Sequence, residues 1–271
     1  MRRLNGTFFT LLSLLIVVNI SRGNEPADPV FRAMRDELDR SMMRLNIPGM
    51  PAPYFMSYQV RDYDILAIEA RYGAIVKSET SRSRSLYIEM RVGSPEFDNT
   101  NYYGSWSDIR NYRERLVEED KYQALRHLIW FNTDKAYKTA LEQLAGKTSF
   151  MQTHPAQDTI PDFAPVQPFV LESEMVKPVA EQTVWEEAVR KIAGALKDIP
   201  SLQDWNVKFN RVTVNRRYLN SERSRFLSGE NYMELEISAT TQASDGQRLT
   251  DFLTYETVSY THLTLPTIYS V

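Results

Sequence analysis

A run of hydrophobic residues at mostly four-residue steps opens the patterned part of the chain and predicts an amphipathic helix. Asp28 stands at the N-cap position and Pro29 at the first helical position, and both residues favour a helix start there. The helix is expected to end before Ile47-Pro48-Gly49, because such a cluster breaks helices. Its apolar stripe consists of Val30, Met34, Leu38, Met42 and Leu45.

Alternating apolar and polar residues follow and predict three consecutive strands over 54–63, 65–78 and 83–92. Asp62-Tyr63-Asp64 is interpreted as the turn between the first two strands, since aspartate favours turns. Strands joined by short turns predict an antiparallel meander with one covered face. Residues 94–119 are polar with weak periodicity, which indicates an ordered loop region.

Helix and strand patterns alternate in the rest of the chain. A helical stripe over 120–151 predicts a long helix. The pattern does not decide whether this helix breaks near Asn132-Thr133. Five prolines between 155 and 178 indicate a linker or an extended segment laid over a surface. Thr183, with Glu186 three residues later, predicts a capping box at the start of a further helix.

Three more strand patterns, over 207–219, 232–241 and 248–257, complete the chain, with Ser244-Asp245-Gly246 as a turn. The predicted fold class is therefore α+β, with antiparallel sheet and helices packed on one face.

Composition narrows the class of protein only slightly. The 271 residues are 42% hydrophobic and 25% charged, which excludes collagen-like and wholly disordered chains. The absence of cysteine excludes disulfides, cysteine zinc sites, iron–sulfur clusters and thiol catalysis. A formal net charge of -3 provides no electrostatic footprint for nucleic acid, so we expect no nucleic-acid partner.

The two ends of the chain are interpreted as segments outside the fold. Arg2 and Arg3, followed by an apolar run too short to span a bilayer, predict a signal peptide over 1–23, with an uncleaved N-terminal anchor as the alternative. Either segment implies export to the bacterial periplasm or cell envelope, without further membrane contact. Residues 258–271 are predicted to be a non-native tail, because residues 258–267 match the translation of a transposase adaptor used in sequencing libraries. A genuine C-terminal strand is the alternative.

Candidate chemistry is sparse. His127 and His154 lack a partner histidine at metal-ligand spacing and are interpreted as ordinary helix and loop residues. The pairs Glu118-Glu119 and Glu186-Glu187 are interpreted as solvated faces or helix-start acids, because adjacent helical side chains point about 100° apart. We therefore predict no catalytic residue and no metal ligand in this chain; its binding residues stay unknown.

Arginines are concentrated on the predicted strands. Arg82, Arg84 and Arg91, with Arg61 and Arg71 on earlier strands, are compatible with an anion or peptide groove. The simpler interpretation is a set of interstrand ion pairs with nearby acids, since opposite charges across strands stabilise a sheet. Those acids are Glu69, Glu79 and Glu89.

Several short motifs occur in an order that resembles the N-terminal half of the TldD/PmbA family, whose members are also described as modulators of DNA gyrase or microcin-processing peptidases. The resemblance covers residues 29–257. The motifs are Pro53-Tyr54-Phe55-Met56-Ser57-Tyr58, Gly73-Ala74, Arg82-Ser83-Arg84, Arg91-Val92-Gly93 with Asp98-Asn99-Thr100, the segment Asp-Lys-Ala-Tyr-Lys-Thr-Ala at 134–140, Asn220-Ser221-Glu222 and Asp245-Gly246. Arg223 departs from the pattern, because the family often has glycine there.

The resemblance implies a zinc-dependent peptidase built from two related subunits around an internal peptide chamber. Its metal motif, H-E-x-x-x-H, lies on a helix after the N-terminal domain, so no catalytic residue and no cofactor can be assigned to this chain. We expect a homo- or heterodimer with a family member and a peptide substrate. The signal peptide does not fit the cytosolic members.

The first hypothesis is therefore a truncated, inactive N-terminal domain of an exported TldD-related zinc metallopeptidase, contributing to the subunit interface and the peptide chamber. The alternative is a non-catalytic partner subunit or a peptide-binding module of the cell envelope; a free-standing envelope binding domain is a third possibility. The expected organisation is a first segment over 24–154, a Pro-rich linker over 155–180, and a helix with antiparallel strands of the same domain over 181–257.

Overall fold

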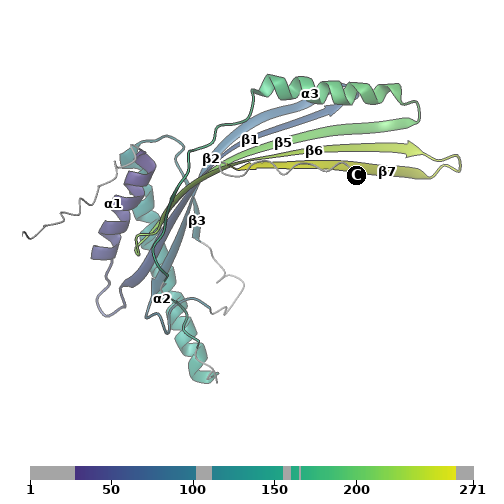
Figure 1. Ribbon diagram of the computed structural model, residues 1–271. Coiled ribbons are helices and arrows are strands. Elements are labelled where there is room, and N and C mark those ends of the chain that lie inside the picture. The colour runs from purple at the N-terminus through teal and green to yellow at the C-terminus, as the bar shows by residue number, and fades with distance from the viewer. Residues whose placement is uncertain (1–27, 102–111, 155–159, 165, 261–271) are drawn as a thin grey trace, which may run out of the picture.

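The computed structural model describes residues 28–101, 112–154, 160–164 and 166–260. Within them the strands form one seven-stranded sheet in the order β3-β2-β1-β5-β6-β4, and β7 also pairs with β6 (Figure 1). The predicted α+β class is confirmed. The elements are α1 (Pro29–Arg44), β1 (Pro53–Arg71), β2 (Ala74–Val92), β3 (Tyr112–Leu116), α2 (Tyr122–Thr153), β4 (Val170–Glu172), α3 (Gln182–Ala195), the 3₁₀ helix η2 (Leu196–Asp198), β5 (Leu202–Asn220), β6 (Arg225–Gln242) and β7 (Arg248–Tyr260).

Long antiparallel hairpins build the sheet, and only β4 runs parallel to its neighbour β6. β1 pairs with β2 on one side and with β5 on the other, so strands from both predicted segments share one sheet. Tyr72 and Gly73 join β1 to β2 with φ of 52° and 80°, which suits a tight two-residue hairpin turn. Gly246 joins β6 to β7 with φ of 89°, as the predicted turn requires.

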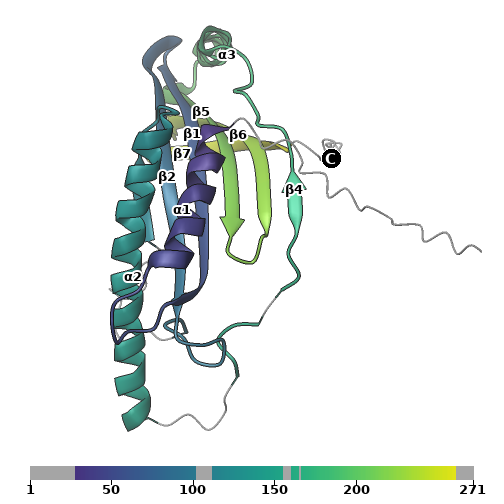
Figure 2. The same cartoon turned by 90° about the vertical axis from the view of Figure 1, so that its left-hand side faces the viewer.

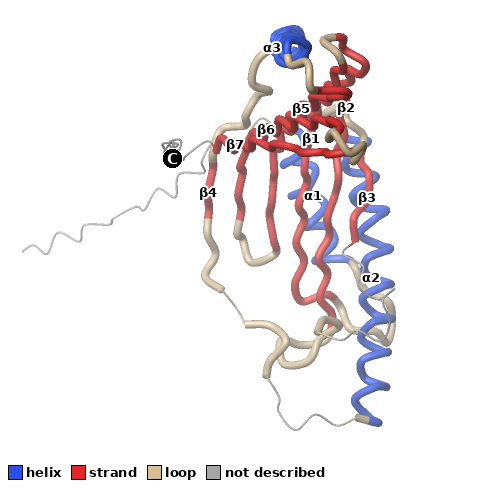
Figure 3. The backbone as a smooth tube through the Cα atoms, turned by 90° about the vertical axis from the view of Figure 1, so that its right-hand side faces the viewer, coloured by secondary structure: helices blue, strands red, loops and turns tan. Residues whose placement is uncertain are grey.

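The helices cover one face of a bent sheet, as predicted. Side chains alternate along a strand, and the even-numbered positions of β1 face the helices along its whole length. Met56, Tyr58 and Val60 pack under α1 and α2, whereas Leu66 and Ile68 belong to a second cluster under α3. The two helical layers thus lie at opposite ends of the same face, on the outer side of the bend (Figures 1 and 2). The inner face carries no described helix (Figure 3).

The predicted turn at Asp62-Tyr63-Asp64 is wrong, because β1 runs straight through it to Arg71. The aspartates are tolerated inside a strand because arginines of the adjacent strands pair with them. The predicted three strands over 54–92 are in fact two long strands. The meander still has three members, because β3 pairs with β2 inside the region predicted to be loop.

Smaller corrections concern the helices and the Pro-rich segment. α1 begins as predicted, with the Asp28 carboxylate accepting the Val30 N–H at 2.8 Å. α2 continues unbroken past Asn132. The predicted capping box on Thr183 is wrong: Glu181 is the N-cap residue of α3, and no side chain caps it. β7 extends to Tyr260, so its last residues lie in the segment predicted to be a non-native tail.

Among the described ranges, no helix is both long and apolar enough to cross a membrane. The predicted signal peptide over 1–23 lies outside the described residues, as does the tail after Tyr260.

Candidate functional site

Eight charged side chains form a layer on the helix-covered face at the bend of the sheet, between the two apolar clusters. This charged layer contains four carboxylates and four guanidiniums, which come from five different elements or their flanks. Its members are Asp28, Asp62, Asp64, Asp120, Arg82, Arg84, Arg211 and Arg217. Because acids and bases are equal in number, the layer neutralises itself.

Arg217 and Arg84 share Asp62 in one half of the layer. The Arg217 guanidinium donates to Asp62 and, at 2.5 Å, to Asp28, so it ties the start of α1 to the centre of the sheet. Arg84 donates to Asp62 and lies 2.8 Å from the carboxylate of Asp120. Burial by itself would lower the pKa of Arg84, but its interactions with Asp62 and Asp120 outweigh burial and raise it.

Asp64 holds the other half together. It accepts hydrogen bonds from Arg82 at 2.9 Å and from Arg211 at 2.7 Å. Arg82 is mostly exposed, whereas Arg211 is buried. The prediction that Arg82 and Arg84 pair across strands with Glu69, Glu79 or Glu89 is therefore wrong. Their partners on β1 are Asp64 and Asp62.

The remaining predicted arginines also have local partners. Arg71 and Arg91 pair with Glu69 and Glu89 on their own strands, two residues away, and Lys77 rather than an arginine pairs with Glu79. Arg61 donates to Gln59 and lies over the ring of Tyr87. Of the five arginines that were compatible with an anion or peptide groove, Arg82 and Arg84 line a common cavity, and aspartates of β1 pair with both.

A cavity of about 420 Å³ lies beside the charged layer. Its walls include Glu118 and Glu119, which are exposed and lie before the start of α2, so this acid pair is solvated, one of its two predicted forms. Val176 and Pro178 also line the cavity; they belong to an extended segment, residues 173–180, which we call the strap. The Pro-rich region is thus partly an extended segment laid over a surface, one of its two predicted forms.

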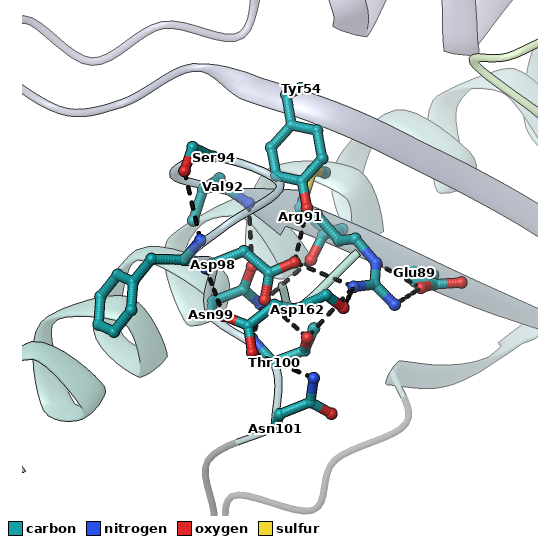
Figure 4. A network of polar contacts seen from close by, with 12 residues as sticks. Tyr54, Glu89, Arg91, Val92, Ser94, Asp98, Asn99, Thr100, Asn101 and Asp162 are labelled. Atoms are coloured by element: carbon teal, nitrogen blue, oxygen red, sulfur yellow. Dashed lines mark hydrogen bonds and ion pairs between the residues drawn. The ribbon is translucent and has the colours of Figure 1, made fainter. Parts of the chain in front are cut away.

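A second polar network anchors the loop after β2 (Figure 4). The Asp98 carboxylate is fully buried and accepts from the Tyr54 hydroxyl at 2.6 Å, the Arg91 guanidinium at 2.9 Å and the Thr100 N–H at 2.6 Å. Burial by itself raises the pKa of Asp98, but these hydrogen bonds outweigh burial and lower it. Burial, together with the adjacent Asp98 charge, raises the pKa of Tyr54.

Asp162 extends this network to α2. It accepts from the Asp98 N–H at 2.8 Å and pairs with the buried Lys147 ammonium, which also donates to the Thr100 carbonyl at 2.8 Å. Asn99 adds the predicted turn chemistry, since its amide oxygen accepts from the Val92 N–H at 2.9 Å. Every polar group here has a structural partner, so the network is an anchor for the loop.

The turn at Asn220-Ser221-Glu222 forms in spite of Arg223. The Asn220 side chain accepts from the Ser224 N–H at 2.8 Å, and Ser221 is hydrogen-bonded to the backbone of Met56. Arg223 has a φ of 73°, a left-handed conformation that favours glycine. Arg223 therefore stands at a backbone position that would suit the glycine that the family often has there.

The two histidines do not meet. His127 is exposed on α2 and contacts the ring of Trp130, whereas His154 stacks on Phe150 at the end of the same helix. Glu186, of the second acid pair, accepts a hydrogen bond from Ser78 at 2.6 Å. Within the described ranges, no three His, Cys, Asp or Glu side chains are grouped so that they could hold a metal ion. The donor set of the described residues does not fit the zinc that the family resemblance implies.

One apolar surface is left open. α3 packs on β1, β2 and β5, and Leu235 and Ile237 on the same face of β6 lie half-buried against its apolar cluster, whereas that face of β7 is exposed. Leu235 and Ile237 pair across the strands with Tyr255 and Leu253, and we call these four residues the open strip. Leu253 and Tyr255 are half exposed or more, on a strand that pairs only with β6 in the described structure. Contiguous exposed apolar residues at a sheet edge are typical of a contact surface.

The fold is a bent sheet with helices on one face and an exposed apolar edge at β7. No family model matches the chain, and no curated protein matches its sequence. Among solved structures, it is similar to a candidate modulator of DNA gyrase from Bacteroides thetaiotaomicron, with a TM-score of 0.51 at 8% identity, covering 83% of this chain and 44% of that chain. The chain thus spans less than half the length of that protein. This likeness shows that the two proteins share a fold over most of this chain.

Two further solved structures are similar at lower scores. A candidate modulator of a DNA gyrase from Thermotoga maritima has a TM-score of 0.49 at 11% identity over 83% of this chain and 43% of that one. TldE from Thermococcus kodakarensis has a TM-score of 0.41 at 15% identity over 82% of this chain and 42% of that one.

Proposed function

We propose that this chain is the N-terminal, non-catalytic part of an exported TldD-related zinc metallopeptidase, in which it forms a wall of the peptide chamber and a subunit contact. The observation that carries the proposal is the open strip beside α3, on a fold like that of the Bacteroides protein. An apolar face of this kind is stabilised when another element or subunit covers it. The alternative is a non-catalytic partner subunit or envelope peptide-binding module.

The intact gene distinguishes these two functions. Sequence beyond Thr257 that encodes H-E-x-x-x-H on a predicted helix would support the peptidase, because this is the metal motif that the family resemblance implies and histidine is a common zinc ligand. A complete second half without that motif would eliminate the enzyme and leave the partner subunit.

The subunit contact can be tested on the chain itself. Sedimentation velocity over a concentration series is expected to show a dimer that Leu253→Lys dissociates, since lysine at a sheet edge opposes strand association. Val184→Lys on α3 is the matched control, because Val184 and Leu253 are similarly exposed, at 54% and 50%. A wild-type chain that stays monomeric throughout, or a dimer equally sensitive to both substitutions, would refute a contact between two copies of this chain through the open strip.

Metal analysis tests the assignment of zinc to another part of the enzyme. The purified chain is expected to carry no stoichiometric zinc, and a chelator is expected to leave its melting temperature unchanged. The reason is that the exposed His127 and His154 lack partner ligands among the described residues. One tightly bound equivalent of zinc would contradict this assignment.

A further inference from the structure

The strap is held to the sheet chiefly through its backbone. The Val176 N–H donates to the Asn215 side-chain oxygen at 2.9 Å, and the Asn215 amide donates back to the Val176 carbonyl at 3.0 Å. The Lys177 carbonyl accepts from Asn231 at 3.1 Å, and the Ala180 carbonyl accepts from Arg211 at 3.2 Å. These contacts recognise peptide groups, which every amino-acid sequence offers.

After Ser173, which is buried and hydrogen-bonded to the Leu227 carbonyl, the side chains of the strap bury little, although the Met175 sulfur accepts from Arg217 at 3.1 Å. Met175 and Val179 are 48% and 39% exposed, and Val176 is only half-buried. A segment with few buried apolar contacts opens at low free energy, well below the cost of unfolding the sheet. Opening of the strap would therefore leave the strands beneath it folded.

The floor beneath the strap, by contrast, is buried and shaped for a backbone. Asn231 and Arg211 are each nine-tenths or more buried, and Arg211 Nε has no hydrogen-bond partner among the described atoms. Gly229 lets the strap approach: a Cβ there would lie 2.9 Å from the Val176 nitrogen and 2.6 Å from Asn215 Oδ1. A side chain at this position would push the strap away. The cavity of about 420 Å³ adjoins the strap along Val176 and Pro178.

We propose that this floor is a binding groove for an extended peptide, with Asn215, Asn231 and Arg211 as its donors and acceptors. In this structure the strap of the same chain occupies the groove. An incoming peptide would offer one peptide group to Asn215 and two carbonyls to Asn231 and Arg211, with tolerance for its sequence. The groove shares its ligand class with the proposed peptide chamber but belongs to this chain alone. Its test therefore does not depend on the proposed catalytic part of the enzyme.

Competition with the strap gives the groove a measurable signature. A peptide in trans binds only the fraction of molecules whose strap has left, so its apparent Kd rises in inverse proportion to that fraction. Val176→Pro removes the N–H that Asn215 accepts without touching the floor. This substitution is expected to free the groove.

The probe is a fluorescent peptide with the sequence of residues 171–181, followed by anisotropy. It is expected to bind Val176→Pro at least about tenfold more tightly than wild type, as release from competition predicts. Adding Asn215→Ala to that variant is expected to abolish the gain. The same peptide N-methylated at its Val176 position keeps every side chain and lacks the N–H, so it should bind at least about tenfold more weakly. Equal binding by wild type and Val176→Pro, or by both peptides, would overturn the groove.

Hydrogen exchange on the wild-type chain gives a second test if Val176→Pro fails to fold. Excess unlabelled peptide is expected to accelerate exchange of the Val176 amide, because displacement breaks its bond to Asn215, while the amides of β5 and β6 stay protected. Unchanged exchange at Val176 under saturating peptide would overturn the proposal.

Discussion

Arg217→Met is expected to destabilise the chain by about 3 kcal/mol, the lower end of the usual cost of breaking a buried ion pair, because Asp62 keeps Arg84 as a partner. The Arg217 side chain is 3% exposed and is the charge that links Asp28, at the start of α1, to Asp62, in the middle of β1. Methionine fills a similar volume, so the loss reports the missing charge more than a cavity. Urea unfolding monitored by circular dichroism measures this loss of stability. The urea concentration at the midpoint is expected to fall, while the dependence of the unfolding free energy on urea stays unchanged.

Arg82→Met is the matched control, because Arg82 belongs to the same charged layer but its side chain is 72% exposed. Its removal is expected to cost less than about 1 kcal/mol, as for other exposed pairs. Arg217→Lys should fall between the two, since lysine keeps the charge but cannot reproduce the two directed bonds. If Arg217→Met and Arg82→Met were equally stable, the charged layer would not hold α1 to the sheet.

The apolar periodicity was sufficient to predict the fold class and most elements. Alternation at Met56, Tyr58 and Val60 identified a strand because its buried face is continuous there. It failed at Asp62 and Asp64, since two aspartates in a row of alternating residues look like a turn unless their partners are known. It also missed β3, whose five residues pair with only one neighbour.

The polar sites were less predictable because their members are distant in sequence. Arg217 and Asp28 are separated by 189 residues, and no local spacing links them. The contact between the strap and Asn215 likewise depends on a chain reversal through α3 that no motif encodes. The network around Asp98 was partly accessible, because Asp98, Asn99 and Thr100 are a turn signature. Its extension to Lys147 and Asp162 depends on how α2 and the segment 160–164 pack.

Asp98→Asn is expected to cost about 2 to 3 kcal/mol at pH 7, because the neutral amide replaces a buried carboxylate that accepts several hydrogen bonds. The cost should depend on pH with a definite sign. The folded pKa of Asp98 lies below its ordinary value, so the carboxylate contributes stability above the unfolded pKa of about 3.9 and loses it as the pH falls through the folded pKa.

The free-energy difference between wild type and Asp98→Asn should therefore be constant from pH 7 to about pH 5 and shrink below about pH 4. Urea titrations at these pH values measure it. Asp134→Asn is the control, because Asp134 makes an exposed pair with Lys138 on α2, and its loss is expected to stay under about 0.5 kcal/mol at every pH. A difference for Asp98→Asn that grew on acidification would mean that the carboxylate is held in its neutral form. The loop after β2 would then be anchored by Lys147 and Asp162 alone.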